Sequence, residues 1–155
     1  MTTIAWDGKT LATDSRGTVG NSIVDDLMVK LAVASETDNW TICGVKVKAF
    51  AGAGSGAIPE ELKEYLIEGI KRNTKMREGF QFSVIAICEH GGFELYKREG
   101  EDGIEIQPLS SRRAMGSGEN FALAAMLSGK DAFEAVQIAM KCDVYSGGSV
   151  DHYTP

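Results

Sequence analysis

Thr2 is the residue whose type and position most directly allow chemistry. If Met1 is removed, Thr2 carries both a hydroxyl and a free α-amine, and the ordinary pKa of that amine lies near 7.7–8.0. A threonine hydroxyl is a weak nucleophile unless a base activates it, and here the base would belong to the same residue. The sequence therefore allows nucleophilic catalysis by an N-terminal threonine. The alternative is an ordinary chain start that loses its methionine without catalytic consequence.

Lys30 is the second candidate, because it interrupts the apolar run LMVKLAV at 27–33. Burying a lone ammonium is unfavourable, so Lys30 either reaches solvent from an edge strand or meets a carboxylate. The Asp7-Gly8 turn predicts a hairpin that returns the chain along 10–14, and Asp14 ends that strand. Asp14 is therefore the expected partner of Lys30.

Three further segments have simple structural interpretations. The run AGAGSG at 51–56 lacks the Gly-Lys-Ser/Thr of a phosphate-binding loop, so close packing of a strand on a helix explains it. Ser117 precedes an Ala-rich helix and could be its N-cap. Asp143 and Ser146 follow the last predicted helix, where a cap and a turn would explain both.

Taken in order, these segments resemble the β-subunits of the proteasome and the bacterial two-component proteasome-like protease, which are N-terminal-nucleophile hydrolases. The resemblance runs from Thr2 to Tyr153, and the spacing of Asp14 and Lys30 matches that family. The matching residues are TTI at 2–4, ATDSR at 12–16, GN at 20–21, Lys30, FAG at 50–52, GSG at 116–118 and CDVYSGG at 142–148.

The resemblance implies a threonine-type endopeptidase that cleaves unfolded polypeptides. Thr2 Oγ1 would attack the carbonyl, and the Thr2 amine would take its proton through a water molecule. Lys30, paired with Asp14, would lower the pKa of the nucleophile, and the backbone N–H of Gly52 would hold the oxyanion. The residues implied to orient the amine are Ser117, Asp143 and Ser146.

Two other functions stay open at this point. A small-amide hydrolase could use the same nucleophile, and activity on amides without activity on peptides would identify it. A catalytically silent shell or scaffold subunit would keep Met1. The resemblance also implies a cyclic homo-oligomer, with an ATPase unfoldase as a partner to be tested.

Strand-rich segments at both ends with helices between them predict one α+β domain over residues 1–155. The resemblance implies a four-layer αββα sandwich of two antiparallel sheets covered by helices. Residues 15–21 are predicted to form a turn-rich loop, either a plain connector or, as the resemblance implies, a border of the substrate cleft. Residues 40–51 are predicted to form a strand. Helices are predicted at 58 to about 73, 119–127 and 131–141. The second long helix that the family usually has after the first is reduced here to 74–79.

Composition narrows the classes of partner. A chain of 155 residues with 43% hydrophobic residues can bury a sizeable core. The net charge of −6 disfavours nucleic acid and anionic membranes, and no apolar run reaches membrane-spanning length. Three widely spaced cysteines in apolar segments are expected to be reduced core residues of a cytoplasmic protein. We expect no metal site and no cofactor.

Overall fold

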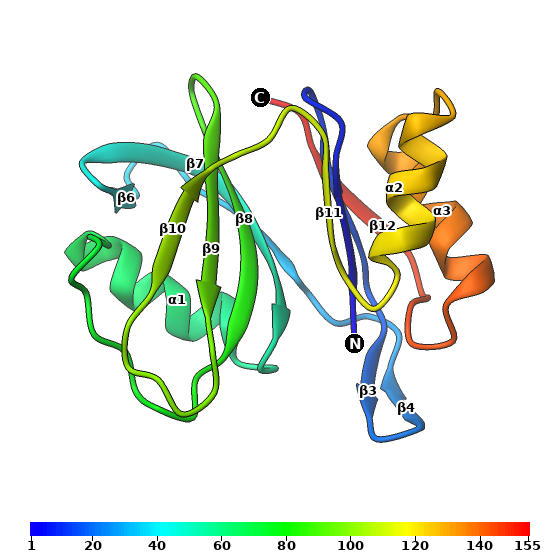
Figure 1. The fold of residues 1–155 in the computed structure, drawn as a ribbon, viewed down its shortest axis with the longest axis horizontal. Coiled ribbons are helices and arrows are strands. Elements are labelled where there is room, and N and C mark those ends of the chain that lie inside the picture. The colour runs from blue at the N-terminus through cyan, green and yellow to red at the C-terminus, as the bar shows by residue number, and fades with distance from the viewer.

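Two antiparallel sheets face each other in the computed structural model, which describes residues 1–155, and helices cover the outer face of each sheet (Figure 1). The predicted four-layer α+β sandwich is confirmed. The elements in chain order are β1 (Thr3–Trp6), β2 (Leu11–Asp14), β3 (Gly17–Val19), β4 (Ser22–Asp25), β5 (Leu31–Val33), β6 (Thr41–Ile42), β7 (Val45–Gly54), α1 (Ile58–Glu68), β8 (Phe82–Cys88), β9 (Gly92–Lys97), β10 (Glu105–Pro108), β11 (Arg113–Gly116), α2 (Glu119–Leu127), α3 (Ala132–Cys142) and β12 (Val150–Tyr153).

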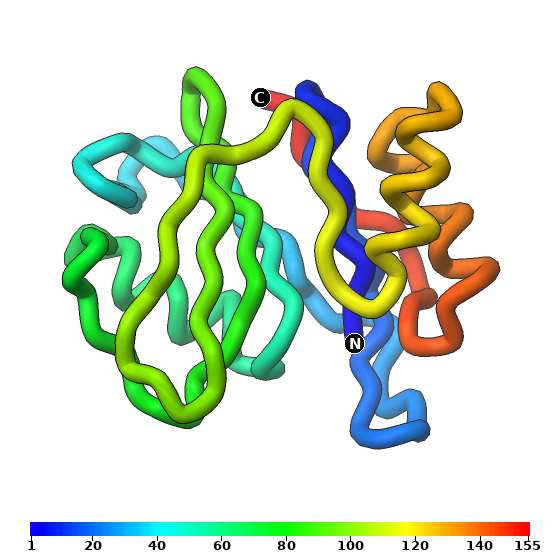
Figure 2. Tube along the Cα trace, in the orientation of Figure 1, coloured from blue at the N-terminus to red at the C-terminus, as the bar shows by residue number.

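The first sheet has the strand order β11-β1-β2-β12, and α2 and α3 cover it. The second has the order β10-β9-β8-β7-β5, with β6 paired to β7, and α1 covers it. The β3–β4 hairpin is a separate two-stranded sheet that projects beyond the sandwich (Figures 1 and 2). No helix is long and apolar enough to cross a membrane.

Strands β1 and β2 are buried on both faces, and their side chains differ in size between the faces. Alanines from β1, β2 and β11 belong to the cluster that packs against α2 and α3, where small side chains let the helices approach closely. Large side chains fill the space between the sheets, and each contributes about 1.5–3 kcal/mol when fully buried. This middle cluster contains Ile4, Trp6, Leu11, Ala51, Ile85, Ile87 and Met115.

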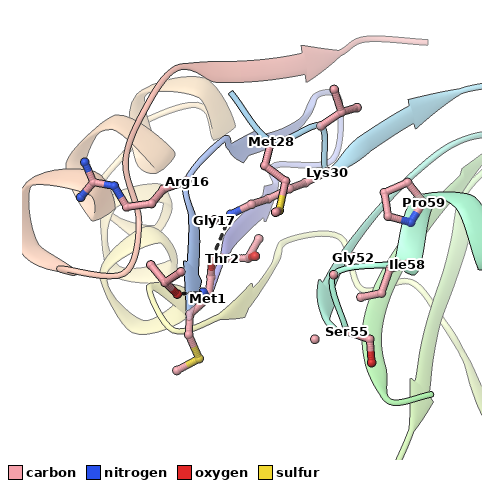
Figure 3. Close-up of a pocket in the computed structure, with 14 residues that line it drawn as sticks. Met1, Thr2, Arg16, Gly17, Met28, Lys30, Gly52, Ser55, Ile58 and Pro59 are labelled. Carbon is pink, nitrogen blue, oxygen red and sulfur yellow. Dashed lines mark hydrogen bonds between the residues drawn. The ribbon is translucent and has the colours of Figure 1, made fainter. Parts of the chain in front are cut away.

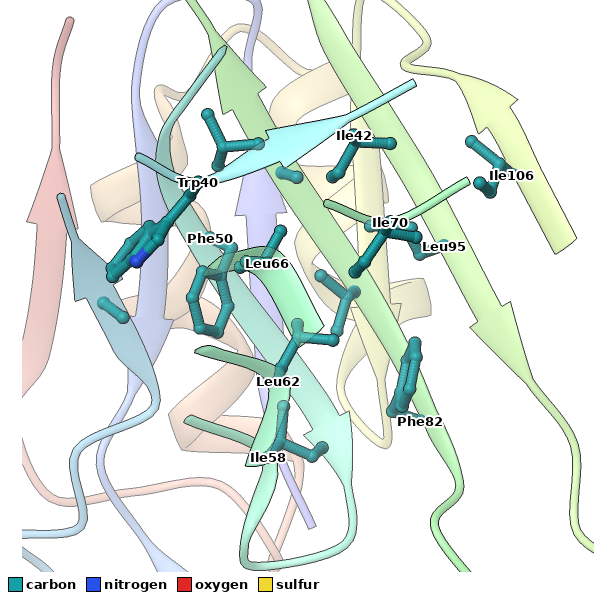
Figure 4. Close-up of a cluster of buried hydrophobic side chains, with 14 of the residues drawn as sticks. Trp40, Ile42, Phe50, Ile58, Leu62, Leu66, Ile70, Phe82, Leu95 and Ile106 are labelled. Carbon is teal, nitrogen blue, oxygen red and sulfur yellow. The ribbon is translucent and has the colours of Figure 1, made fainter. Parts of the chain in front are cut away.

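The largest cluster lies between the second sheet and α1 (Figure 4). The buried residues of α1 are Ile58, Leu62 and Leu66, at the spacing of one helix face. They pack against apolar side chains from β7 and β8, and Trp40 packs against Phe50 with ring centroids 5.5 Å apart. This layer fixes β7, which passes the site described below.

Several local predictions were wrong. Residues 15–21 are not only a loop, because 17–19 pair with 22–25 as β3 and β4. The predicted strand 40–51 is divided by a turn in which Cys43 (φ 50°) and Gly44 (φ 79°) both have positive φ. Helix α1 ends at Glu68 because the next residues leave it to pair with β6. The Ile70 N–H donates to the Thr41 carbonyl, and Ile70 forms a parallel bridge with Ile42.

The cysteine prediction was also wrong in part. Cys88 is buried, and its burial raises the pKa of the thiol to about 11. Cys43 and Cys142 are exposed. Cys43 lies at the tip of the turn between β6 and β7, which the expected continuous strand did not include.

Candidate active site

Thr2 lies at one end of the sandwich, immediately before β1. Strand β2 ends beside it at Asp14, and β11 ends at Gly116, which is registered opposite Thr3. Thr2 is only 5% exposed, yet it lines two adjoining pockets. In Figure 3, Thr2 and Lys30 lie on one side of the first pocket, and Gly52, Ser55 and Ile58 lie across from them.

Asp14 is fully buried and accepts four hydrogen bonds. Its Oδ1 accepts from the Thr3 N–H at 2.9 Å and from Lys30 Nζ at 3.0 Å. Its Oδ2 accepts from the backbone N–H groups of Gly147 at 3.0 Å and Arg16 at 3.2 Å. The pairing of Lys30 with Asp14 that the sequence predicted is therefore present. The partners of Asp14 in β1, in the segment before β5 and in the loop after α3 hold the carboxylate in place.

Lys30 has a second contact, which points toward Thr2. Its Nζ donates to the Met1 carbonyl at 2.9 Å, so the ammonium lies against the peptide bond that precedes Thr2. Burial lowers the pKa of Lys30, and the attraction of Asp14 only partly opposes this effect. The surroundings thus disfavour the ammonium on balance. A titratable group held in that way beside a pocket is typical of a functional site.

A second acidic group, Asp143, is linked to Thr2 through Ser117. Asp143 follows α3, and its Oδ2 accepts from Ser117 Oγ at 2.5 Å and from Ser146 Oγ at 2.6 Å. Burial alone would raise the pKa of Asp143, but these hydroxyls and the Tyr145 N–H outweigh it and lower the pKa. Asp143 is therefore an anion at neutral pH.

Asp143, Ser117 and Ser146 form a cluster that contacts Thr2 and the next residue, Thr3. Ser117 Oγ lies 3.4 Å from the Thr2 carbonyl oxygen. The Thr3 and Ser146 hydroxyls are 2.6 Å apart, and since the Ser146 proton goes to Asp143, Thr3 is the donor to Ser146. Ser117 is not the N-cap of α2, as one interpretation of the sequence had it. The cap position is Gly118, which makes no side-chain hydrogen bond.

Gly52 lies on β7, across the first pocket from Lys30. A Cβ at Gly52 would fall 2.6 Å from Ile58 Cγ2 and 2.9 Å from Val84 Cγ2, so close packing of strand and helix requires glycine here. The Lys48 carbonyl accepts from the Ala34 N–H, and peptide groups alternate along a strand. The N–H and C=O of Gly52 therefore point to the side of β7 on which β5 lies. Strand β5 begins only at Leu31, opposite Ala51, so no β5 residue is registered opposite Gly52.

The structure thus brings all seven candidate residues to one end of the sandwich. Residues that the sequence analysis did not assign are Thr3, Ser15, Arg16 and Gly147, which hold the assigned ones. All four lie inside the motifs quoted above, within two positions of a candidate residue. That proximity was the available signal, but the sequence did not reveal which atoms they contact.

Three solved structures are similar to this chain over nearly its full length. Thiobacillus denitrificans BPH has a TM-score of 0.65 and 17% identity, covering 99% of this chain and 96% of that chain. Its complex with epoxomicin has a TM-score of 0.63 and 17% identity, covering 99% and 97%. Eukaryotic HslV from Trypanosoma brucei has a TM-score of 0.60 and 21% identity, covering 98% and 97%.

These likenesses confirm the four-layer α+β fold that the sequence resemblance implied. At such identities they establish the fold alone. No protein-family model matches the sequence, and no curated protein matches it significantly.

Proposed function

We propose that this chain is a threonine-type endopeptidase that hydrolyses peptide bonds in unfolded polypeptides, with Thr2 as the nucleophile. The observation that carries the proposal is the position of the Lys30 ammonium. It bonds to buried Asp14 and to the carbonyl of the residue before Thr2. Removal of whatever precedes Thr2 would free its amine at this position, between Lys30 and the Asp143 cluster.

The proposed reaction begins with attack of Thr2 Oγ1 on the substrate carbonyl. The Thr2 amine takes the hydroxyl proton through a water molecule, and Lys30 stabilises the developing negative charge on the oxygen. The N–H of Gly52 binds the oxyanion of the tetrahedral intermediate. The leaving amine takes a proton from the Thr2 ammonium as the C–N bond breaks, and water then hydrolyses the resulting ester.

The remaining residues act on the amine rather than on the substrate. Asp143 is a carboxylate within hydrogen-bonding distance of Ser117 and Ser146, and it favours a cationic amine nearby. Ser117 and Ser146 fix the orientation of this carboxylate. These three residues would therefore hold the amine and stabilise the ammonium that forms when it takes the hydroxyl proton.

The proposal includes a closed cyclic homo-oligomer, because an open threonine site would degrade unfolded protein indiscriminately. The exposed apolar side chains Phe121 and Leu127 of α2, 42% and 66% exposed, give a surface that such contacts could cover. Static light scattering should report a multiple of the 16.6 kDa chain mass. A strict monomer that degrades unfolded protein would contradict the ring. We also propose an ATPase unfoldase as a partner of this ring.

The test of the activity uses Thr2→Ala and Thr2→Ser in protein whose Thr2 amine is free, as checked by intact mass. Thr2→Ala should abolish cleavage of unfolded casein, and Thr2→Ser should retain part of it because both the hydroxyl and the amine remain. Both variants should fold, since the Thr2 hydroxyl takes no part in the hydrogen bonds around it. Full turnover by Thr2→Ala would refute the mechanism.

Epoxomicin, bound by one of the similar structures, serves as a second probe. One molecule should add to wild-type protein and none to Thr2→Ala. Activity on small amides but not on peptides would favour the small-amide hydrolase instead.

A further inference from the structure

Residues 26–30, which connect β4 to β5, carry Lys30 but have no regular structure. Leu27 and Val29 are 80% and 64% exposed, so packing of these side chains does not hold the segment. The Lys30 ammonium is nevertheless buried and keeps its contact with Asp14. Other contacts must therefore fix the backbone from which the Lys30 side chain extends.

These contacts come from the two residues that follow Asp14. The Met28 N–H donates to the Ser15 carbonyl at 2.9 Å, and Ser15 Oγ donates to the Asp26 carbonyl at 2.7 Å. Arg16 holds the Asp26 side chain through Nε–Oδ1 at 2.8 Å and Nη2–Oδ2 at 3.4 Å. Asp14 supplies the carboxylate for Lys30, and the two residues after it, Ser15 and Arg16, hold the segment that carries Lys30.

Arg16 also reaches the opposite loop. A Cβ at Gly147 would lie 2.4 Å from Arg16 Cζ, so the guanidinium lies directly against that glycine. The N–H of Gly147 donates to Asp14, and Arg16 Nη1 donates to the Val144 carbonyl at 3.4 Å. Arg16 therefore contacts both loops that carry charged groups of the site, the one with Lys30 and the one with Asp143.

We propose that Arg16, paired with Asp26, is a positioning residue that fixes the backbone carrying Lys30 and so holds the Lys30 ammonium beside Thr2. The role is geometric, because Arg16 and Asp26 are partly exposed and such pairs add little to stability. Their mutual hydrogen bond raises the pKa of Arg16 and lowers that of Asp26, so both are charged at neutral pH. The effect on turnover rests on the proposed function, whereas the effect on Lys30 does not.

The test uses Arg16→Lys, which keeps the charge but loses the two-pronged geometry, and Asp26→Asn. The matched controls are Arg77→Lys and Glu61→Gln. Arg77 and Glu61 form the same kind of pair, with Nε–Oε1 at 2.6 Å and Nη2–Oε2 at 2.8 Å, and neither lines a pocket at Thr2. Thermal unfolding of all four variants compares their effects on stability.

The first measurement is hydrolysis of a short peptide amide. Arg16→Lys and Asp26→Asn should each lower kcat about 100-fold with little change in KM, because a misplacement of about 1 Å at a catalytic group has an effect of that size. The double variant should be no slower than the slower single variant, since both changes remove one interaction. Wild-type kcat in Arg16→Lys, or an equal loss in Arg77→Lys, would overturn the proposal.

The second measurement needs no activity. The pKa of Lys30 is read by NMR titration of lysine labelled with ¹³C at Cε. The charged groups that act on Lys30 are Asp14, Asp143 and Arg16, and the Arg16→Lys variant keeps all three charges. Because burial is the main cause of the lowered pKa, release of the segment should raise it toward 10.5. A wild type that cleaves no peptide would overturn the proposed function but not the positioning role. A Lys30 pKa that is the same in Arg16→Lys as in the wild type would overturn the positioning role.

Discussion

Replacing Lys30 by methionine removes the ammonium while keeping most of the volume of the side chain, so the change tests charge rather than packing. Asp14 then keeps three backbone donors, the N–H groups of Thr3, Arg16 and Gly147, but has lost its ion-pair partner. Breaking a fully buried pair from one side costs about 3–5 kcal/mol. The three remaining donors stabilise the carboxylate, so we expect a loss near 3 kcal/mol in the free energy of unfolding.

Urea unfolding at pH 7 measures that loss, and peptide hydrolysis measures activity. Lys97 provides the matched control, because it is also buried but its Nζ bonds only to the backbone carbonyls of Glu78, Arg98 and Glu101. Lys97→Met should lower stability and leave kcat unchanged in the fraction that is folded. Lys30→Met should lower both, and Lys30→Arg should not restore activity, since a planar guanidinium replaces a compact ammonium.

A double variant separates stability from catalysis. Asp14→Asn combined with Lys30→Met removes both charges and should recover part of the stability, because no unpaired ion remains, but none of the activity. The reasoning would be refuted if Lys30→Met were fully active. It would equally be refuted if Lys30→Met unfolded with a free energy within about 0.5 kcal/mol of the wild type, because exposed sites give changes of that size.

Two further predictions concern the surroundings of Thr2. Gly116→Ala should cost about 1–3 kcal/mol more in urea unfolding than Gly129→Ala. Both glycines have positive φ, 95° and 101°, but a Cβ at Gly116 would fall 1.9 Å from the Thr2 carbonyl oxygen and a Cβ at Gly129 meets nothing within 4 Å; equal losses would contradict this. Asp143→Asn should flatten the loss of stability in acid, measured by urea unfolding between about pH 2 and 5. The pKa of Asp143 is lowered in the folded protein, so its contribution to the free energy of unfolding is present above the ordinary pKa of 3.8 and is lost as the pH falls through the folded pKa. If Asp143→Asn loses stability in acid as steeply as the wild type, Asp143 does not titrate as described.

The last two helices could be predicted because they carry strong local signals, whereas the four layers were implied by the resemblance. Helix α2 was predicted with the bounds it has, and the predicted start of the next helix, Asp131, caps α3 by accepting from the Glu134 N–H. The β3–β4 hairpin could not be predicted in this way. All four residues of β4 are exposed, so no alternation of apolar and polar residues marks the strand.

The end of α1 was missed for a different reason. Ile70 continues the apolar spacing of Ile58, Leu62 and Leu66, and it is fully buried. The spacing therefore predicted its burial correctly, although not its helical backbone. The burial is achieved by pairing with β6 rather than by another helical turn. The spacing of apolar residues identifies which side chains are buried. Whether the backbone there is helical or extended depends on pairing with a strand that the spacing does not reveal.

The Lys30–Asp14 pair shows how far residue types alone can reach. The need to neutralise a buried ammonium called for a carboxylate, and the predicted hairpin that ends at Asp14 identified which one. In the structure β2 belongs to the first sheet, whereas Lys30 leads into β5 of the second. The pair therefore joins the two sheets at the end of the sandwich where Thr2 lies. Its geometry depends on how the sheets pack, which is why the contacts of Ser15 and Arg16 that fix it could be recognised only in three dimensions.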